Sequence, residues 1–273
     1  MIEQATFSRN KRTLLNHFRY LLSRRELLIS LTMREIKARY RQSILGFGWA
    51  LLVPLFQMVV LSIVFGKIIG VPSDGRPYPV FSYVAILPWT LFSSAIAASV
   101  PSILGNMELV TKIYFPREIL PLSSILARLV DFAVASTIYI GLILYYHIPV
   151  HKTLVIVPVL LIIQITLSIG IGLLGSAVSV FLRDISFAIP VAMQIWMYAT
   201  PVIYPSSLVP ERWRALYMLN PMAGIIDSYR KVVLDGVWPD IGVLAYSAVF
   251  SVVLCLVAYW YFKRLEMAMS DII

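Results

Sequence analysis

Residues 31–56 read LTMREIKARYRQSILGFGWALLVPLF, and this stretch decides which kind of fold the chain can adopt. Its first half gathers four cations, which are Arg34, Lys37, Arg39 and Arg41. No further charged residue follows until Lys67. A helix that crosses a lipid bilayer needs roughly 20 apolar residues. The apolar run after residue 43 meets that requirement, and the cations before it suit the inner end of such a helix, beside anionic lipid headgroups.

The composition of the whole chain argues against a water-soluble domain. Of its 273 residues, 59% are hydrophobic and only 14% are charged, whereas soluble domains carry about 25% charged residues. Six long apolar runs are present, at residues 44–69, 80–104, 119–146, 153–182, 185–204 and 241–262. They lack the two-residue alternation of barrel strands, and a backbone in lipid must satisfy its own hydrogen bonds. We therefore expect an all-α polytopic membrane protein with six transmembrane helices.

The distribution of lysine and arginine predicts the orientation of these helices. Fifteen of the cations fall on the side that holds both chain ends, against seven on the other side. Because cytoplasmic loops carry the excess of such residues, both termini are expected in the cytoplasm. The chain then divides into a cytoplasmic amphipathic region (1–43), a transmembrane domain (44–262) and a cytoplasmic tail (263–273). The net charge of +9 belongs to the inner membrane face, so nucleic acid is not an expected partner.

Residue types that hold metals or carry out catalysis are scarce. The single cysteine, Cys255, excludes an intrachain disulfide and a cysteine-based metal site. The three histidines lie outside the apolar runs, and no GxxxxGK[S/T] loop for nucleotide phosphates occurs. The first 26 residues lack the apolar core of a cleavable signal peptide. We therefore expect no cofactor and no enzymatic site in this chain.

Ahead of the first run, an apolar stripe predicts a helix that lies in the headgroup layer. Ile29, Met33, Ile36 and Tyr40 recur at helical spacing, and the four cations border this stripe. An ordinary positively charged anchor with no further role remains the alternative.

The inner loop 105–118 (GNMELVTKIYFPRE) predicts a short helix over 107–114, which Pro116 ends. Glu108 and Lys112 are one turn apart on it and can form an ion pair. Its apolar residues either dock into a groove of another protein or pack against the spans of this chain, and the sequence leaves both open.

The outer loop 205–240 predicts two short helices separated by Asn220-Pro221. Asn220 is a good N-cap, Pro221 a good first residue, and Gly236 an end signal. Each helix is too short to cross the bilayer, so the pair predicts a re-entrant outer hairpin between helices five and six. A hairpin that lies on the membrane surface is the alternative.

Inside the runs, three further patterns call for interpretation. Gly170, Gly172 and Gly175 form a literal GxGxxG, but no charged residue is near, so we interpret Ser168, Gly172 and Ser176 as a small-residue packing face. Arg128 and Asp131 are three apart in the third run and predict an intramembrane ion pair. Four aromatic residues well inside the runs either stack on passing sugar rings or pack the core: Phe92, Tyr139, Trp196 and Tyr198.

Taken in order along the chain, several segments resemble one family, the membrane subunits of type-2 ABC exporters for O-antigen and capsule polysaccharides. The segments are REIKARYRQSILGFGWALLVPLF (34–56), LVTKIYFPREILPLSS (109–124), FLRD (181–184), YATPVIYP (198–205), LNPM (219–222) with YR (229–230), and FKRLE (262–266). The resemblance covers nearly the whole chain. It implies a homodimer in a bacterial inner (plasma) membrane, with two cytoplasmic ATP-binding subunits that hold ATP and magnesium.

The resemblance also implies roles for particular residues. The segment matching the cytoplasmic coupling helix, which meets the ATPase, holds Glu108, Lys112, Tyr114, Phe115, Pro116 and Arg117. The interface helix, where cations would also meet the pyrophosphate of a polyprenyl-linked glycan, holds Arg34, Lys37, Arg39 and Arg41. The outer hairpin would act as a gate through Pro210, Trp213, Asn220, Pro221, Tyr229 and Arg230.

Other functions remain open at this point. A permease of the same superfamily could export teichoic acid, capsule or small molecules. A membrane-embedded enzyme acting on lipid-linked sugar would need an acid or histidine cluster at one membrane depth, which the sequence lacks. An ion-coupled secondary transporter would use Arg128 and Asp131.

Overall fold

The computed structural model describes residues 24–41, 43–113 and 115–269, and all regular elements in these ranges are helical. In chain order the α-helices are α2 (Arg25–Tyr40), α3 (Gly48–Leu61), α4 (Tyr78–Ser99), α5 (Met107–Lys112), α6 (Ile119–Tyr146), α7 (Val157–Phe181), α8 (Asp184–Tyr198), α9 (Glu211–Tyr217), α10 (Pro221–Arg230) and α11 (Ile241–Met269). Short 3-10 and π segments extend or link them: η1 (Ser62–Ile68), η2 (Val100–Ser102), η3 (Leu104–Asn106), η4 (Lys152–Ile156), η5 (Ser206–Leu208) and η6 (Lys231–Asp235). The predicted all-α class is confirmed for the described part of the chain.

Five helical segments among the described residues are long and apolar enough to cross a membrane. They are Gly48–Ile68, Tyr78–Ser102, Ile119–Tyr146, Lys152–Phe181 and Ile241–Glu266. The predicted run 185–204 instead contains α8, which has 15 residues and ends at Tyr198. A helix of that length spans about 22 Å, which is less than the roughly 30 Å of a bilayer core.

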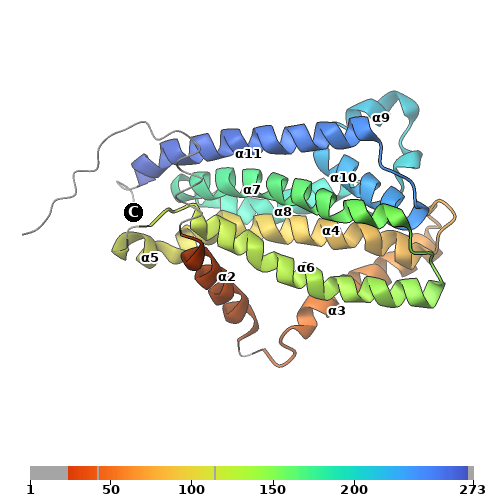
Figure 1. Cartoon of the computed structure of the whole chain (residues 1–273), viewed down its shortest axis with the longest axis horizontal. Coiled ribbons are helices and arrows are strands. Elements are labelled where there is room, and N and C mark those ends of the chain that lie inside the picture. Colours follow the sequence, from red (N-terminus) through yellow and green to blue (C-terminus); the bar gives the residue numbers. More distant parts are fainter. Residues whose placement is uncertain (1–23, 42, 114, 270–273) are drawn as a thin grey trace, which may run out of the picture.

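The long helices lie along one axis, with short elements gathered at both ends (Figure 1). α2 and α5 lie at the end where α6 begins and where α7 and α11 finish, whereas α9 lies at the other end. Because α7 finishes at one end and α11 begins at the opposite end, residues 182–240 carry the chain along the length of the bundle.

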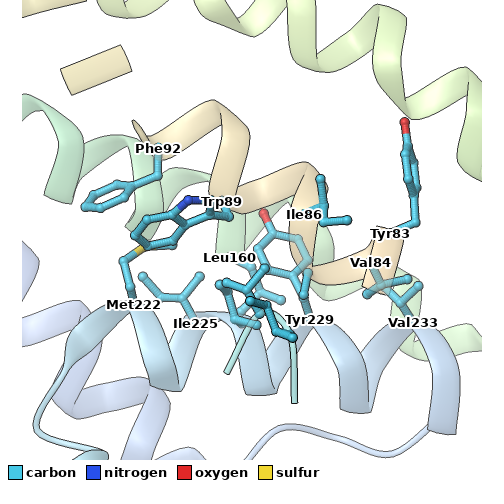
Figure 2. Packing of buried hydrophobic residues seen from close by; sticks show 14 of the residues in the cluster. Tyr83, Val84, Ile86, Trp89, Phe92, Leu160, Met222, Ile225, Tyr229 and Val233 are labelled. Atoms are coloured by element: carbon cyan, nitrogen blue, oxygen red, sulfur yellow. The ribbon is translucent and has the colours of Figure 1, made fainter. Parts of the chain in front are cut away.

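The main core joins α4 to the outer hairpin. Figure 2 shows Trp89 and Phe92 of α4 near Met222 and Ile225 of α10, with Leu160 of α7 beside them. All ten residues of α10 are buried, whereas α9 is largely exposed. The two helices of the hairpin therefore differ: α10 is part of the core, whereas α9 lies at the edge of the bundle (Figure 1).

Small residues let α7 pack closely on α4, as the sequence predicted. A Cβ atom added to Gly172 would lie 2.5 Å from Ser99 Oγ, and one added to Gly175 would lie 2.5 Å from Val100 Cγ2. Ser168 and Ser176 are buried on the same face. The GxGxxG pattern therefore serves helix packing in this structure.

A second core cluster closes the end of the bundle where α2 and α5 lie. Leu31 of α2 and Val110 of α5 pack there with Phe115, Ile119 of α6 and Phe262 of α11. This cluster packs α2 and α5 against α6, α7 and α11.

Candidate functional site

Residues 107–117, the predicted coupling segment, divide into an exposed face and a buried face. Glu108 and Lys112 form an ion pair of 3.4 Å, with side chains 91% and 73% exposed. Phe115 and Pro116 are buried, and Arg117 is half-buried. Tyr114 lies outside the described residues. α5 ends at Lys112 rather than at residue 114, because the backbone becomes extended at Ile113.

For most apolar residues of this segment, the structure shows packing against the spans of this chain rather than exposure for docking into another protein. Leu109, Val110 and Phe115 pack against the second core cluster of this chain. Ile113 is different, since 56% of its surface is exposed beside Lys112. The exposed side of α5 and its C-cap, which we call the free face of α5, therefore presents Ile113 beside the charged Glu108 and Lys112.

Directly after the coupling segment, a buried acid joins α6 to α11. Glu118 accepts a hydrogen bond from Lys263 Nζ at 2.7 Å, and its side chain is only 2% exposed. Lys263 also donates to Glu266 at 2.9 Å. Glu266 in turn accepts from the backbone N–H of Arg117 at 3.4 Å. This joint between the start of α6 and the end of α11 was not predicted, although the charges of FKRLE at the end of an apolar run were visible.

Three of the four cations predicted for an interface helix, which lie on α2 and its end, are exposed, and the fourth points into the protein. Arg34, Lys37 and Arg41 are on the outside of α2 and its end. Arg34 also donates to the side chain of Asn106, just before α5. Arg39 points toward α6 and pairs with Asp131.

The predicted ion pair of α6 is present and forms part of a larger cluster. Arg128 Nη1 lies 3.6 Å from Asp131 Oδ2. The same carboxylate accepts hydrogen bonds from Arg39 and from the Tyr40 hydroxyl. Burial, followed by the hydrogen bond to Asp131, raises the pKa of Tyr40 to about 12. Tyr40 therefore keeps its proton at neutral pH and remains a donor to the acid.

A cavity of about 300 Å³ lies beside this cluster, between α2, α3, α4 and α6. Arg39, Arg128 and Asp131 line one part of it, while Val53 and Leu91 line the apolar part. Sequence spacing revealed only the Arg128–Asp131 pair, because α2 and α6 are distant in the chain and meet only in the folded protein.

Between α9 and α10, Asn220 connects α8 to α10. Its Oδ1 accepts from Met222 N at 3.1 Å, which is the predicted N-cap, and also from Trp196 Nε1 at 3.0 Å. Its amide nitrogen donates to the Ala199 carbonyl at 3.0 Å and to Thr200 Oγ1 at 2.9 Å. The cap of α10 thereby fixes the end of α8.

Arg230 performs a similar joining role from inside the core. Its side chain donates to the carbonyls of Tyr204 at 3.0 Å and Val202 at 2.9 Å. The guanidinium carbon lies 3.8 Å from the centre of the Phe81 ring. A buried cation thus attaches the turn after α8 to both α10 and α4.

The other gate candidates lie on both sides of the hairpin. Pro210 and Trp213 are exposed at α9, with 52% of the Trp213 surface accessible. Pro221 begins α10, as predicted, and Tyr229 is buried within it. Gly236, with φ of +66°, ends the hairpin at the predicted position.

The four aromatic candidates for a glycan path have unequal exposure. Phe92 has no accessible surface and packs edge-on against Trp196, with ring centres 5.3 Å apart. In this conformation its role is packing rather than stacking on sugar. Trp196 and Tyr139 are half-buried, whereas Tyr198 at the end of α8 is 54% exposed.

Sequence reasoning overlooked the glutamines of the spans. Gln57 of α3 and Gln194 of α8 are both exposed and line the same groove. An uncharged amide in the middle of an apolar run was the available signal. Among the described residues, no group of three or more His, Cys, Asp or Glu could hold a metal ion.

Comparison with known proteins adds a family and several relatives. A family model described as ABC-2 type transporter matches residues 26–234. The O-antigen export system permease protein RfbA of Myxococcus xanthus is 34% identical over 240 residues, which cover 86% of this chain and 91% of that protein. A protein of the same name from Klebsiella pneumoniae is 27% identical over 213 residues, which cover 78% and 82%. The polysialic acid transport protein KpsM of Escherichia coli is 27% identical over 248 residues, which cover 88% and 93%.

Proposed function

Because the chain belongs to the ABC-2 type transporter family, we propose that it is the membrane-spanning subunit of an ATP-driven polysaccharide exporter. The observation that carries this proposal is the 34% identity to an O-antigen export permease across 91% of that protein's length. The cargo is a glycan attached to a polyprenyl pyrophosphate lipid, and the chain moves it outward across the bacterial inner membrane. The similarity to polysialic acid transport proteins favours a capsule polymer as the second candidate cargo.

The energy for transport comes from a separate protein in this account. The sequence contains no GxxxxGK[S/T] loop, so ATP and its magnesium ion belong to a cytoplasmic partner subunit. Two such subunits serve two copies of this chain. The outward faces of α3 and α8 support pairing, since each exposes large apolar side chains such as Phe56 and Ile195.

The free face of α5 is the proposed contact with the ATPase. Ile113 supplies an exposed apolar anchor, and Glu108 and Lys112 surround it with exposed charge. Because the other apolar residues of the segment are fixed in the second core cluster, a push on α5 moves the start of α6 and, through Glu118 and Lys263, the end of α11.

Co-purification tests the proposed function. The tagged chain is expressed with candidate ATPase subunits, and the complex is sized after detergent extraction. We expect two copies of this chain with two ATPase subunits, and ATP hydrolysis only when both proteins are present. Exchanging Ile113 for Asp should abolish assembly, whereas Val150→Asp, at an exposed position in the loop after α6 and away from this face, serves as the matched control. Hydrolysis of ATP by the purified chain alone contradicts the proposal.

We also propose that α8 begins a sixth crossing, which the hairpin of α9 and α10 completes. The support is that residues 182–240 carry the chain from one end of the bundle to the other (Figure 1). The burial of α10 fits a re-entrant position. A short helix at membrane depth leaves non-helical backbone at its ends, and such backbone must be enclosed by protein.

Accessible tags check this topology. An epitope inserted after Ser207 should react with antibody on spheroplasts, from which the outer membrane has been opened, and one placed after residue 273 should react only after the inner membrane is permeabilised. Surface labelling of the C-terminal tag contradicts the proposed six crossings with both termini inside. On this orientation, exposed Arg34, Lys37 and Arg41 lie at the inner leaflet, where they meet anionic headgroups and the cargo pyrophosphate.

A further inference from the structure

A shallow groove of about 390 Å³ lies between α3, α4 and α8. Its hydrogen-bonding side chains are Gln57, Ser93, Ser94 and Gln194, and the indole of Trp89 forms part of its wall. Gln57 and Trp89 are near the middle of their spans, Gly48–Ile68 and Tyr78–Ser102. None of the nine described residues that line the groove is ionisable. The groove is therefore uncharged and located well inside the membrane, and it combines an apolar wall with four hydrogen-bonding side chains.

The two glutamines are the strongest indication that this groove faces water or polar cargo. Both side chains are exposed, and a primary amide offers two donors and an oxygen acceptor. Gln57 accepts one weak hydrogen bond, from Thr90 Oγ1 at 3.4 Å. Among the described residues, Gln194 has no hydrogen-bond partner. Leaving such groups unpaired in hydrocarbon costs several kcal/mol each.

Two threonines of the spans show how other polar side chains there are satisfied by their own helix. Exposed Thr137 donates to the Val134 carbonyl at 2.7 Å, and half-buried Thr166 donates to the Ile162 carbonyl at 2.8 Å. The remaining described glutamine, Gln164, is buried and donates to the Pro88 carbonyl at 2.8 Å. The two glutamines that are exposed thus line one groove, and a lipid environment on that face would leave them unpaired.

We propose that this groove is the membrane-level wall of the glycan path, where Gln57, Ser93, Ser94 and Gln194 form exchangeable hydrogen bonds with sugar hydroxyls and water. This inference rests on the proposed function. Uncharged donors and acceptors suit a neutral, hydroxyl-rich chain, because no fixed charge holds it at one position. Exposed Tyr198 follows Met197, which lines the groove, and offers a sugar-stacking face toward the outer end of α8. The outward faces of α3 and α8 place a second copy opposite, which completes the enclosure.

Thiol labelling of the assembled complex tests the path. Cys255, the single cysteine, is first replaced by alanine, and cysteine is then introduced by Gln57→Cys or Gln194→Cys. Thr137→Cys on α6 and Val253→Cys on α11 are the matched controls, because both positions are exposed at membrane depth on helices that do not line the groove. A charged, water-soluble methanethiosulfonate reacts only with thiolate, which forms in water. We expect groove cysteines to react at least about tenfold faster than the controls, and their modification to stop export.

A second measurement removes the hydrogen-bonding groups. The double change Gln57→Leu with Gln194→Leu should lower export about tenfold, as expected for two lost hydrogen bonds, while the complex still assembles. Groove cysteines that react as slowly as the controls overturn the proposal. Groove cysteines that resist the reagent but form disulfides between two copies also overturn it, and assign the groove to the contact between subunits.

The outcomes separate this inference from the proposed function. If the wild-type complex exports no polysaccharide, the proposed function fails first. If the wild-type complex exports polysaccharide and the double leucine variant exports it equally well, the function stands and the groove is not the path.

Discussion

Replacing Lys263 with methionine is expected to destabilise the protein by about 3–5 kcal/mol. The change removes the ammonium group that lies 2.7 Å from Glu118 and 2.9 Å from Glu266. Glu118 is 2% exposed, so its charge would remain buried, and the Tyr259 hydroxyl at 3.5 Å would be its remaining side-chain donor among the described residues. Breaking a buried pair from one side leaves an uncompensated charge, which costs far more than the pair itself contributes.

The measurement is the thermal midpoint at which the detergent-solubilised complex loses its single sizing peak. Lys112→Met is the matched control, since Lys112 pairs with Glu108 on the surface and its loss should change stability by less than about 1 kcal/mol. Adding Glu118→Gln to Lys263→Met should restore most of the midpoint. If Lys263→Met behaves like the control, Glu118 is not held by this pair. On the proposed coupling role, the variant complex should also export less polysaccharide per ATP hydrolysed.

Replacing Asp131 with alanine is expected to destabilise the protein by about 3 kcal/mol, the lower end for a buried pair. Asp131 is the shared acceptor of Arg39, Tyr40 and Arg128. Its removal leaves two guanidinium groups facing each other, with α2 no longer attached to α6 at this point. The side chains are 21–24% exposed, so water compensates part of the loss.

Two variants on the same elements sharpen this prediction. Arg41→Ala removes an exposed cation at the end of α2 and should leave the thermal midpoint nearly unchanged. Adding Arg39→Ala to Asp131→Ala should recover part of the loss, because only one buried guanidinium then remains. An Asp131→Ala complex that melts like the wild type would mean that the cluster does not stabilise α2 on α6. The ion-coupled alternative makes a different forecast, in which this variant loses transport without any loss of stability.

The long spans and the start and end of α10 in the hairpin were predictable because they depend on residues close together in the sequence. The length and apolarity of each run predict the crossings. Asn220 and Pro221 start α10, and Gly236 ends the helical segment that continues it. The partners of buried charge were not predictable in the same way. Arg39 and Asp131 are 92 residues apart, and Glu118 and Lys263 are 145 apart. Their pairing depends on how α2 and α11 pack on α6.

The residues of the candidate glycan path were also not predictable from the sequence, because their exposure depends on tertiary packing. Aromatic content suggested Phe92 and Trp196, but tertiary packing encloses Phe92 and gives the Trp196 indole a partner in Asn220. The exposed amides of Gln57 and Gln194 become informative only when α3 and α8 are seen on either side of α4. The run 185–204 was long enough in sequence, yet α8 ends at Tyr198 because the chain turns there into the hairpin.

ATP-dependent translocation tests the central claim most directly. The complex of this chain with its ATPase is reconstituted in vesicles with the ATPase outside, and lipid-linked polysaccharide is added with a glycosidase as probe. The account predicts that ATP makes the polymer resistant to the glycosidase, by moving it into the lumen, and that a non-hydrolysable analogue does not. Protection without ATP, or protection by vesicles that contain this chain without the ATPase, would contradict it.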